Sequence, residues 1–158
     1  MEASTKAVHT PKDPAYATRV RASFERQRVM AWLGAQLTHL SPGECEISLA
    51  HKPELTQQHG YIHGGIIGTI GDTAAGYAAY TLMPRDASVL TVEYKMNIMA
   101  PGDGECLIAR GEVIRAGRSL VVARADVFAL KNGRETLCAS LLQTLMTMHG
   151  KPDRQALL

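Results

Sequence analysis

Apolar and polar residues alternate along the second half of the chain, most regularly from Leu90 to Met99. A period of two is typical of a β-strand that buries one face. Turn-forming residues follow at 101–104, at 116–119 and at Asn132-Gly133, the strongest two-residue signal for a hairpin with a type I′ turn. We therefore predict four strands, at residues 90–99, 106–115, 120–130 and 136–148.

The first half of the chain mixes helical and strand patterns. Asp13 and Pro14 suit the cap and first position of a helix, and apolar residues at helical spacing continue it to about Leu33. Residues 63–83 are apolar almost all round, as in a buried helix. We predict, in order, a helix, two strands, a loop and a long helix, at residues 14–33, 35–40, 45–51, 52–62 and 64–83.

This order of elements defines a fold class. Strands linked by hairpins favour an antiparallel sheet, and a helix that is apolar on all sides has to be covered by that sheet. The sequence therefore predicts an α+β domain in which a curved antiparallel sheet wraps around one long central helix. The length of 158 residues fits a single domain. We place it at residues 13–149, between a flexible N-terminal tail at 1–12 and a flexible C-terminal tail at 150–158.

Composition and charge exclude several classes of protein. A net charge of +2 gives no strong attraction to nucleic acid. Three separated cysteines without a CxxC pair predict neither a disulfide framework nor a zinc site, and His59 and His63 lack the glutamate of a zinc-binding HExxH motif. The N-terminus has no hydrophobic signal core, so we expect a cytoplasmic protein. Residues 66–83 approach the length of a membrane span, but Asp72 in their middle favours a buried helix.

Candidate chemistry concentrates on the long helix. Its small residues recur at helical spacing and form one stripe that carries a single carboxylate: Gly64, Gly68, Asp72, Ala75 and Ala79. Small residues allow a backbone or a ligand to approach closely. A lone carboxylate on such a face needs a partner or a function.

The N-terminus of this helix is a second candidate feature. The N–H groups of Gly64 and Gly65 suit an oxygen that becomes negative during a reaction. Gly64 and Asp72 are eight residues apart, about 12 Å along a helix, too far to act on one carbonyl within a chain. If both take part, the site needs two chains, so we predict a homodimer. Two antiparallel copies of the helix, packed through the glycine stripe, are the arrangement we expect.

These residues match a known family. The run Gln57-x5-His63-Gly64-Gly65-x6-Asp72, a strand containing Thr91-Val92-Glu93 and then Ala100-Pro101-Gly102 resembles the hotdog-fold acyl-CoA thioesterases, most closely the PaaI-type branch of phenylacetic acid degradation. The resemblance covers about residues 25–148. It implies the hotdog fold, a hydrolase activity on acyl-CoA thioesters, and a homodimer with active sites at its interface. A homotetramer, as a dimer of such dimers, is the further assembly we expect.

The resemblance also implies roles for individual residues. Asp72 corresponds to the general base or nucleophile, and the Gly64 N–H to the group that polarises the thioester carbonyl. Gln57 corresponds to the residue that orients water or thioester, with Gln58 as the alternative by one position. Thr91 corresponds to a hydroxyl residue beside the acid. His63 is either a further catalytic residue or a structural histidine that bonds loop backbone.

The turn at 115–119 matches the family's turn near the phosphates of coenzyme A. We therefore expect coenzyme A contacts from Arg115, Gly117, Arg118 and Ser119, although Arg118 alone also fits an ordinary turn residue. No metal or prosthetic group is expected, since coenzyme A is part of the substrate. Neither nucleic acid nor a membrane is an expected partner.

The predicted function is hydrolysis of an acyl-CoA thioester to free acid and coenzyme A. Two alternatives stay open. A hotdog dehydratase or hydratase would use a histidine with an acidic partner, but five residues after Asp72 the helix has Tyr77. A non-catalytic acyl-CoA-binding protein would lack a carboxylate at the site. The sequence leaves open the acyl group, the choice between base and nucleophile, and the choice between dimer and tetramer.

Overall fold

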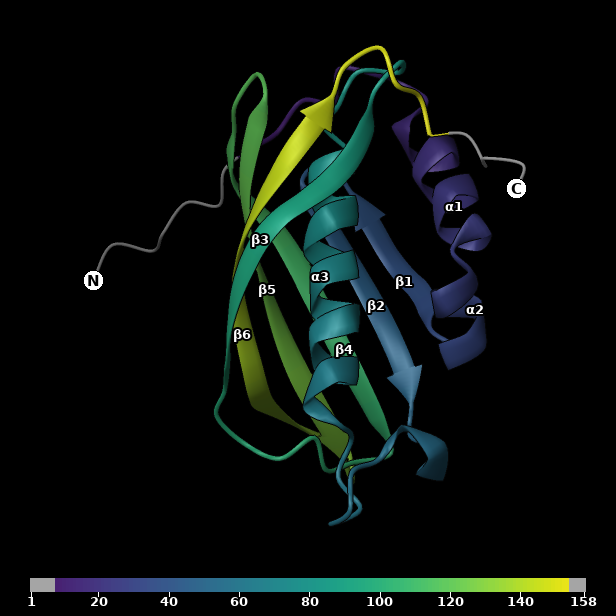
Figure 1. The fold of residues 1–158 in the computed structure, drawn as a ribbon, viewed down its shortest axis with the longest axis vertical. Coiled ribbons are helices and arrows are strands. Elements are labelled where there is room, and N and C mark those ends of the chain that lie inside the picture. Colours follow the sequence, from purple (N-terminus) through teal and green to yellow (C-terminus); the bar gives the residue numbers. More distant parts are fainter. Residues whose placement is uncertain (1–7, 154–158) are drawn as a thin grey trace.

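The computed structural model describes residues 8–153 (Figure 1). Its helical elements are α1 (Tyr16–Arg26), α2 (Arg28–Leu33), the 3-10 turn η1 (Pro53–Leu55) and α3 (Gly64–Tyr80). Its strands are β1 (Gln36–Ser41), β2 (Glu44–Ala50), β3 (Ser88–Ile98), β4 (Cys106–Ala116), β5 (Leu120–Lys131) and β6 (Arg134–Met148). The predicted order of elements is confirmed.

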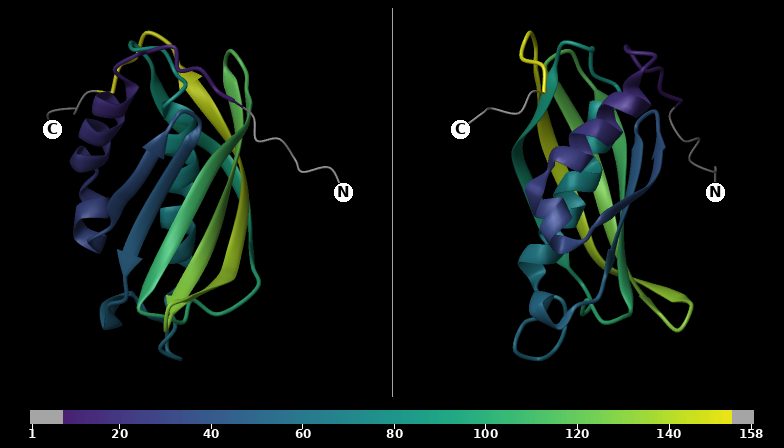
Figure 2. Two further views of the ribbon diagram at one scale, coloured as in Figure 1. Left: turned by 180° about the vertical axis from the view of Figure 1, so that it is seen from behind. Right: turned by 90° about the vertical axis from the view of Figure 1, so that its right-hand side faces the viewer.

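The six strands form one antiparallel sheet in the order β1-β2-β4-β5-β6-β3. The sheet curves around α3, and α1 and α2 lie beside α3 near the β1 edge (Figures 1 and 2). From Ile67 onward nearly every residue of α3 is buried. β4 runs so close to α3 that a Cβ on Gly111 would lie 2.3 Å from the carbonyl oxygen of Ala74. The fold is the predicted hotdog arrangement, with a sheet wrapped around one central helix.

The hairpin between β5 and β6 has the predicted turn. Asn132 and Gly133 both have positive φ angles, 51° and 74°, as a type I′ turn requires. By contrast, the single helix predicted for 14–33 is two helices. Gln27 leaves the helical conformation with ψ 101°, and its side chain instead donates a hydrogen bond to Tyr77 on α3. A tertiary contact thus interrupts a segment whose local pattern is helical.

Strand β3 contains an irregularity that its alternating sequence does not predict. Thr91 pairs with Leu145, but Glu93 pairs with Thr144, so the register shifts by one residue at Val92. A bulge of this kind turns the side chains beyond it to the opposite face. As a result Thr91 and Tyr94 both face α3, whereas an uninterrupted alternation would place them on opposite faces.

Parts of the predicted tails contact the body of the protein. His9 Nε2 lies 3.2 Å from the carbonyl oxygen of Val113, and Arg26 Nη2 donates to Asp153 Oδ2 at 2.9 Å. Residues 1–7 and 154–158 of those tails lie outside the described residues. Within residues 8–153, no helix combines the length and apolar character needed to cross a membrane.

Candidate active site

The Asp72 carboxylate is held by side chains from two strands. Thr91 on β3 donates from Oγ1 to Asp72 Oδ1 at 2.7 Å. Gln143 on β6 donates from Nε2 to the same oxygen and lies 3.1 Å from Thr91 Oγ1. No residue from 8 to 153 forms a hydrogen bond to the second oxygen, Oδ2. These three residues, which we call the carboxylate half, leave one carboxylate oxygen available to a substrate or water.

A cavity of about 310 Å³ adjoins the carboxylate half. Its lining combines residues of α3 and β3 with Gln27: Gln27, Asp72, Thr73, Gly76, Tyr77, Val89, Leu90 and Thr91. Two lining residues are joined, since Gln27 Nε2 donates to Tyr77 Oη at 3.1 Å, and Tyr77 Oη lies 3.1 Å from Ser23 Oγ outside the lining. Burial raises the pKa of Tyr77 to about 12, so its hydroxyl stays uncharged at neutral pH.

The N-terminus of α3 carries an unpaired donor. His63 caps the helix, because its Nδ1 accepts the Gly65 N–H at 2.9 Å. The Gly64 N–H has no acceptor among residues 8–153. Of the two glycine N–H groups predicted to bind an oxygen, only that of Gly64 is therefore available. The structure gives His63 the capping role, one of the two roles open to it, while its catalytic role stays a prediction.

Gln57 lies in a second cavity, of about 380 Å³, together with Gly64. Its Oε1 accepts a hydrogen bond from the His59 N–H. Gln58 is exposed and does not line this cavity, so the geometry favours Gln57 between the two candidates. We call Gln57, His63 and Gly64 the donor half.

The two halves lie apart within one chain. The cavity at Asp72 includes residues 89–91 at the beginning of β3, whereas the cavity at Gly64 includes residues 98–102 at its end. The two linings have no residue in common. A single chain therefore does not bring Gly64 and Asp72 to one carbonyl, as the helical spacing predicts.

The expected packing of two helices through the glycine stripe is wrong. A Cβ on Gly64 would lie 2.9 Å from Ile98 Cδ1, and a Cβ on Gly68 would lie 3.2 Å from Tyr94 Oη. Both neighbours belong to β3 of the same chain. Small residues permit close approach without specifying by what, and here the chain's own sheet takes that place.

The turn predicted to contact coenzyme A joins β4 to β5. It lies at the end of the sheet where α3 ends, opposite Gly64 (Figure 1). Gly117 donates to the carbonyl oxygen of Leu120 at 2.9 Å, and His149 Nε2 lies 2.9 Å from the Arg118 carbonyl oxygen. The side chains of Arg115, Arg118 and Ser119 are exposed. Their roles stay predictions.

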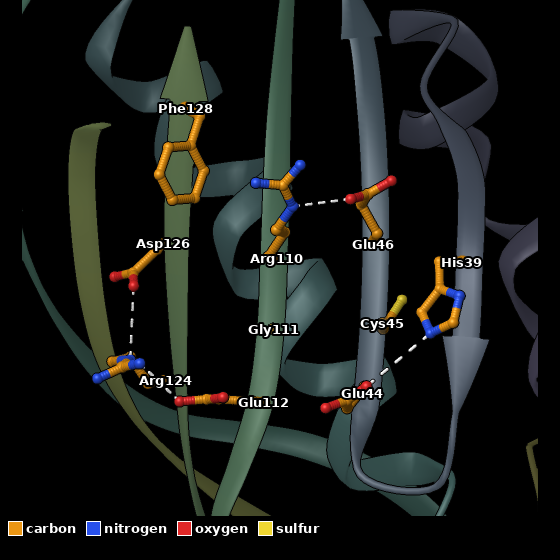
Figure 3. Close-up of a pocket in the computed structure, with 10 residues that line it drawn as sticks. All are labelled: His39, Glu44, Cys45, Glu46, Arg110, Gly111, Glu112, Arg124, Asp126 and Phe128. Atoms are coloured by element: carbon orange, nitrogen blue, oxygen red, sulfur yellow. Dashed lines mark hydrogen bonds and ion pairs between the residues drawn. The ribbon is translucent and has the colours of Figure 1, made fainter. Parts of the chain in front are cut away.

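A further cavity lies on the sheet face away from α3, but its charges are already paired (Figure 3). Arg110 contacts Glu46 at 2.8 Å, and Arg124 contacts Glu112 at 2.6 Å. Arg110 also binds both oxygens of Glu135, and this hydrogen bonding lowers the pKa of that carboxyl. None of the predicted site residues lines this cavity, so we assign it no part in the reaction.

The family can now be identified. A sequence model of the thioesterase superfamily matches residues 59–136. The crystal structure of a thioesterase family protein from Silicibacter pomeroyi is similar over 85% of this chain and 99% of its own, with a TM-score of 0.84 and 47% sequence identity. The chain belongs to the thioesterase superfamily, and the predicted hotdog thioesterase fold is confirmed.

Two other similarities are more distant. The medium/long-chain acyl-CoA thioesterase YigI of Escherichia coli is 25% identical over 129 residues, which cover 72% of this chain and 81% of that protein. The structure of the PaaI protein of the E. coli phenylacetic acid degradation operon is similar over 87% of this chain and 96% of its own, with a TM-score of 0.78 and 16% identity. At that identity the likeness concerns the fold, and assignment to the PaaI-type branch stays a prediction.

Sequence reasoning missed two residues near the carboxylate. Gln143 stands at an inward position of β6, between Leu141 and Leu145, where the alternation predicts an apolar residue. A polar residue at a strand position where the pattern predicts an apolar one is the sequence signal that could have identified Gln143. Gln27 offered no comparable signal, because its place beside Tyr77 follows from how α1 packs on α3.

Proposed function

We propose that this protein is an acyl-CoA thioesterase, in which one chain supplies the carboxylate half and a second chain the donor half of each site. One observation carries the proposal: among residues 8–153 nothing pairs with the Gly64 N–H at the N-terminus of α3 or with Oδ2 of Asp72. An N–H donor can stabilise the oxyanion that forms in thioester hydrolysis, and a carboxylate can act as its base or nucleophile.

The position of each half along β3 supports the pairing of two chains. Within the described part of the chain, β3 is an edge strand that pairs only with β6. An antiparallel pairing of two β3 strands about their middle would set the end of one, beside Gly64, against the beginning of the other, beside Asp72. Each dimer would then contain two complete sites related by a two-fold axis.

The surface of β3 is consistent with this interface. Leu90 and Val92 are more than half exposed, at 55% and 53%, and Ile98 is 50% exposed. A long edge strand with exposed apolar side chains is a template for pairing with another strand. Association of two such dimers into a tetramer stays a prediction that native mass spectrometry tests.

The proposed reaction uses groups of both chains. The thioester carbonyl oxygen accepts the Gly64 N–H of one chain, and Gln57 orients the thioester or water. On one route, Oδ2 of Asp72 in the other chain takes a proton from water as the water oxygen attacks the carbonyl carbon. On the other route, Oδ2 itself attacks that carbon and gives a mixed anhydride. Collapse of the tetrahedral intermediate breaks the carbon–sulfur bond and expels coenzyme A as thiolate, which takes up a proton. On the anhydride route a water molecule then hydrolyses the anhydride, which releases the free acid and restores the Asp72 carboxylate. Thr91 holds the other carboxylate oxygen, Oδ1, throughout.

The carrier is proposed to extend to the β4–β5 turn of one of the two chains. The guanidinium groups of Arg115 and Arg118 suit phosphate oxygens, and Gly117 and Ser119 belong to the same turn. These contacts would hold the nucleotide end of the substrate, far from the reacting carbonyl.

The purified protein tests this function directly. We expect it to release free coenzyme A, detected with a thiol reagent, from at least one of acetyl-, hexanoyl-, palmitoyl-, benzoyl- and phenylacetyl-CoA. Binding of an acyl-CoA without release would favour a non-catalytic binding protein. Loss or gain of water on an enoyl- or hydroxyacyl-CoA, with the thioester intact, would favour a dehydratase or hydratase.

A further inference from the structure

Gln143 is a buried polar residue in an otherwise apolar row. It faces α3 from the middle of β6 and is 1% exposed. Its strand neighbours on the same face, Leu141 and Leu145, are also fully buried. Burial of a carboxamide costs free energy unless hydrogen bonds compensate it. Its Oε1 has no partner among residues 8–153, so an apolar side chain of similar size would satisfy the core better.

The other end of the carboxamide explains why a glutamine occupies this position. Nε2 donates to Asp72 Oδ1 and lies within hydrogen-bond distance of Thr91 Oγ1. The opposite orientation of the amide would set its oxygen against a carboxylate oxygen, so an ionised Asp72 selects the donating orientation.

We propose that Gln143 is a positioning residue for the Asp72 carboxylate in thioester hydrolysis. The inference rests on the proposed function and adds a residue to it. With Thr91, Gln143 places two donors on Oδ1, which fixes the carboxylate and directs Oδ2 toward the cavity. Gln143 does not touch the substrate and acts through Asp72.

The hydroxyl of Thr91 gains its direction from the same contact. A hydroxyl has one proton to donate, and here it goes to Asp72 Oδ1. The Gln143 N–H occupies an acceptor site of that hydroxyl, so the hydroxyl proton points at the Asp72 carboxylate. The donors thus form a short chain from Gln143 through Thr91 to Asp72, which ends on the charged group.

The first test replaces the carboxamide with an apolar chain of similar length. We expect Q143M to fold and to lower kcat by roughly ten- to hundredfold, the value of hydrogen bonds to a charged group. KM for the acyl-CoA should change by less than about twofold, because substrate contacts are intact. The matched control is T147V, which removes a buried hydroxyl from the same face of β6 and should leave kcat unchanged. Equal losses in both variants would overturn the proposal.

A second variant gives a signature that a structural role would not produce. Q143E places a second carboxyl beside Asp72, and two carboxyls in contact share one proton. At acidic pH the protonated carboxyl can donate to Asp72 as the amide does, whereas at neutral pH the charges repel. We expect Q143E to lose activity as pH rises through a range where the wild type keeps it. A pH profile of wild-type shape would contradict the proposal. This arm also decides the matter if Q143M fails to fold.

The closing experiment is a double-mutant cycle with D72N, assayed at high enzyme concentration. If Gln143 acts through Asp72, its substitution should lower kcat little further once the carboxylate has been removed. We therefore expect Q143M to slow the wild type by ten- to hundredfold and D72N by less than about threefold. Equal factors in both backgrounds would overturn the role of Gln143 but not the proposed function. A wild-type protein without thioester hydrolysis would overturn the proposed function itself.

Discussion

The carboxylate half of the site is held by side chains, whereas the donor half is held by backbone. Asp72 receives its hydrogen bonds from Thr91 and Gln143, which reach it from two strands. Gly64 is positioned by the cap of α3 and keeps an N–H without an acceptor among the described residues. One half is a hydrogen-bonded cluster of side chains between α3 and the sheet, and the other is a helix end that follows a loop. In the carboxylate half, a substitution of similar shape can remove the reacting group and keep the fold. In the donor half, only a residue without an N–H can remove the reacting group.

The carboxylate half should show the largest effect. D72N keeps the shape of the side chain and its place beside Thr91 but removes the base or nucleophile. We expect kcat to fall by roughly 10²–10⁴, the usual contribution of a positioned acid–base group. Steady-state assays of coenzyme A release, with circular dichroism as the folding control, measure this. Near-normal hydrolysis by a folded variant would remove Asp72 from the mechanism.

In the donor half, loss of the Gly64 N–H should lower the activity nearly as much. G64P removes the N–H at the first position of α3, where proline is tolerated. The preceding residue, His63, already has an extended conformation with ψ 137° that precedes proline readily. We expect kcat to fall by roughly 10²–10³, as for one lost oxyanion donor.

The matched control for this change is G64A. Both substitutions add a Cβ toward Ile98, but only proline removes the N–H. Equal losses in the two variants would show that crowding, rather than the missing donor, lowers the activity.

The turn that is proposed to hold coenzyme A lies outside both halves. A substitution in this turn should therefore weaken substrate binding without slowing the reaction. We expect R118A to raise KM for an acyl-CoA by about five- to thirtyfold, in line with one exposed charge-assisted contact, and to leave kcat nearly unchanged. Hydrolysis of an acyl-N-acetylcysteamine, which lacks the nucleotide, should not change. Equal effects on both thioesters would move the phosphate contact to another part of the surface.

The smallest effect concerns the cap that orders the donor half. H63A removes the acceptor of the Gly65 N–H, and we expect the free energy of unfolding to fall by about 1 kcal/mol. H59A is the control, because that side chain is exposed and forms no hydrogen bond among the described residues. Urea titration of both variants measures the difference. An unchanged stability in H63A would mean that the cap does not stabilise α3.

The sequence predicted the fold well because local patterns specify most of it. The alternation along β4 to β6 and the Asn132-Gly133 turn depend only on neighbours in the chain, and so does the apolar character of α3. The bulge at Val92 and the break at Gln27 depend on tertiary contacts, so the local sequence pattern does not predict them.

The candidate site was predictable to a different degree in each half. The glycines and Asp72 stand in one short run with recognisable spacing. Gln143 lies 71 residues after Asp72, and only the pairing of β6 with β3 brings it to the carboxylate. The glycine stripe showed that something approaches α3 closely, but composition could not distinguish a partner helix from the chain's own β3.

The central claim is that each site takes one half from each of two chains, and complementation between inactive variants tests it most directly. D72N and G64P chains are mixed, and subunit exchange is followed by native mass spectrometry. Random exchange makes half of the dimers mixed, and each mixed dimer has one intact site, so about a quarter of the wild-type activity should return. If mixed dimers form and the activity stays at the level of the separate variants, the site does not span two chains.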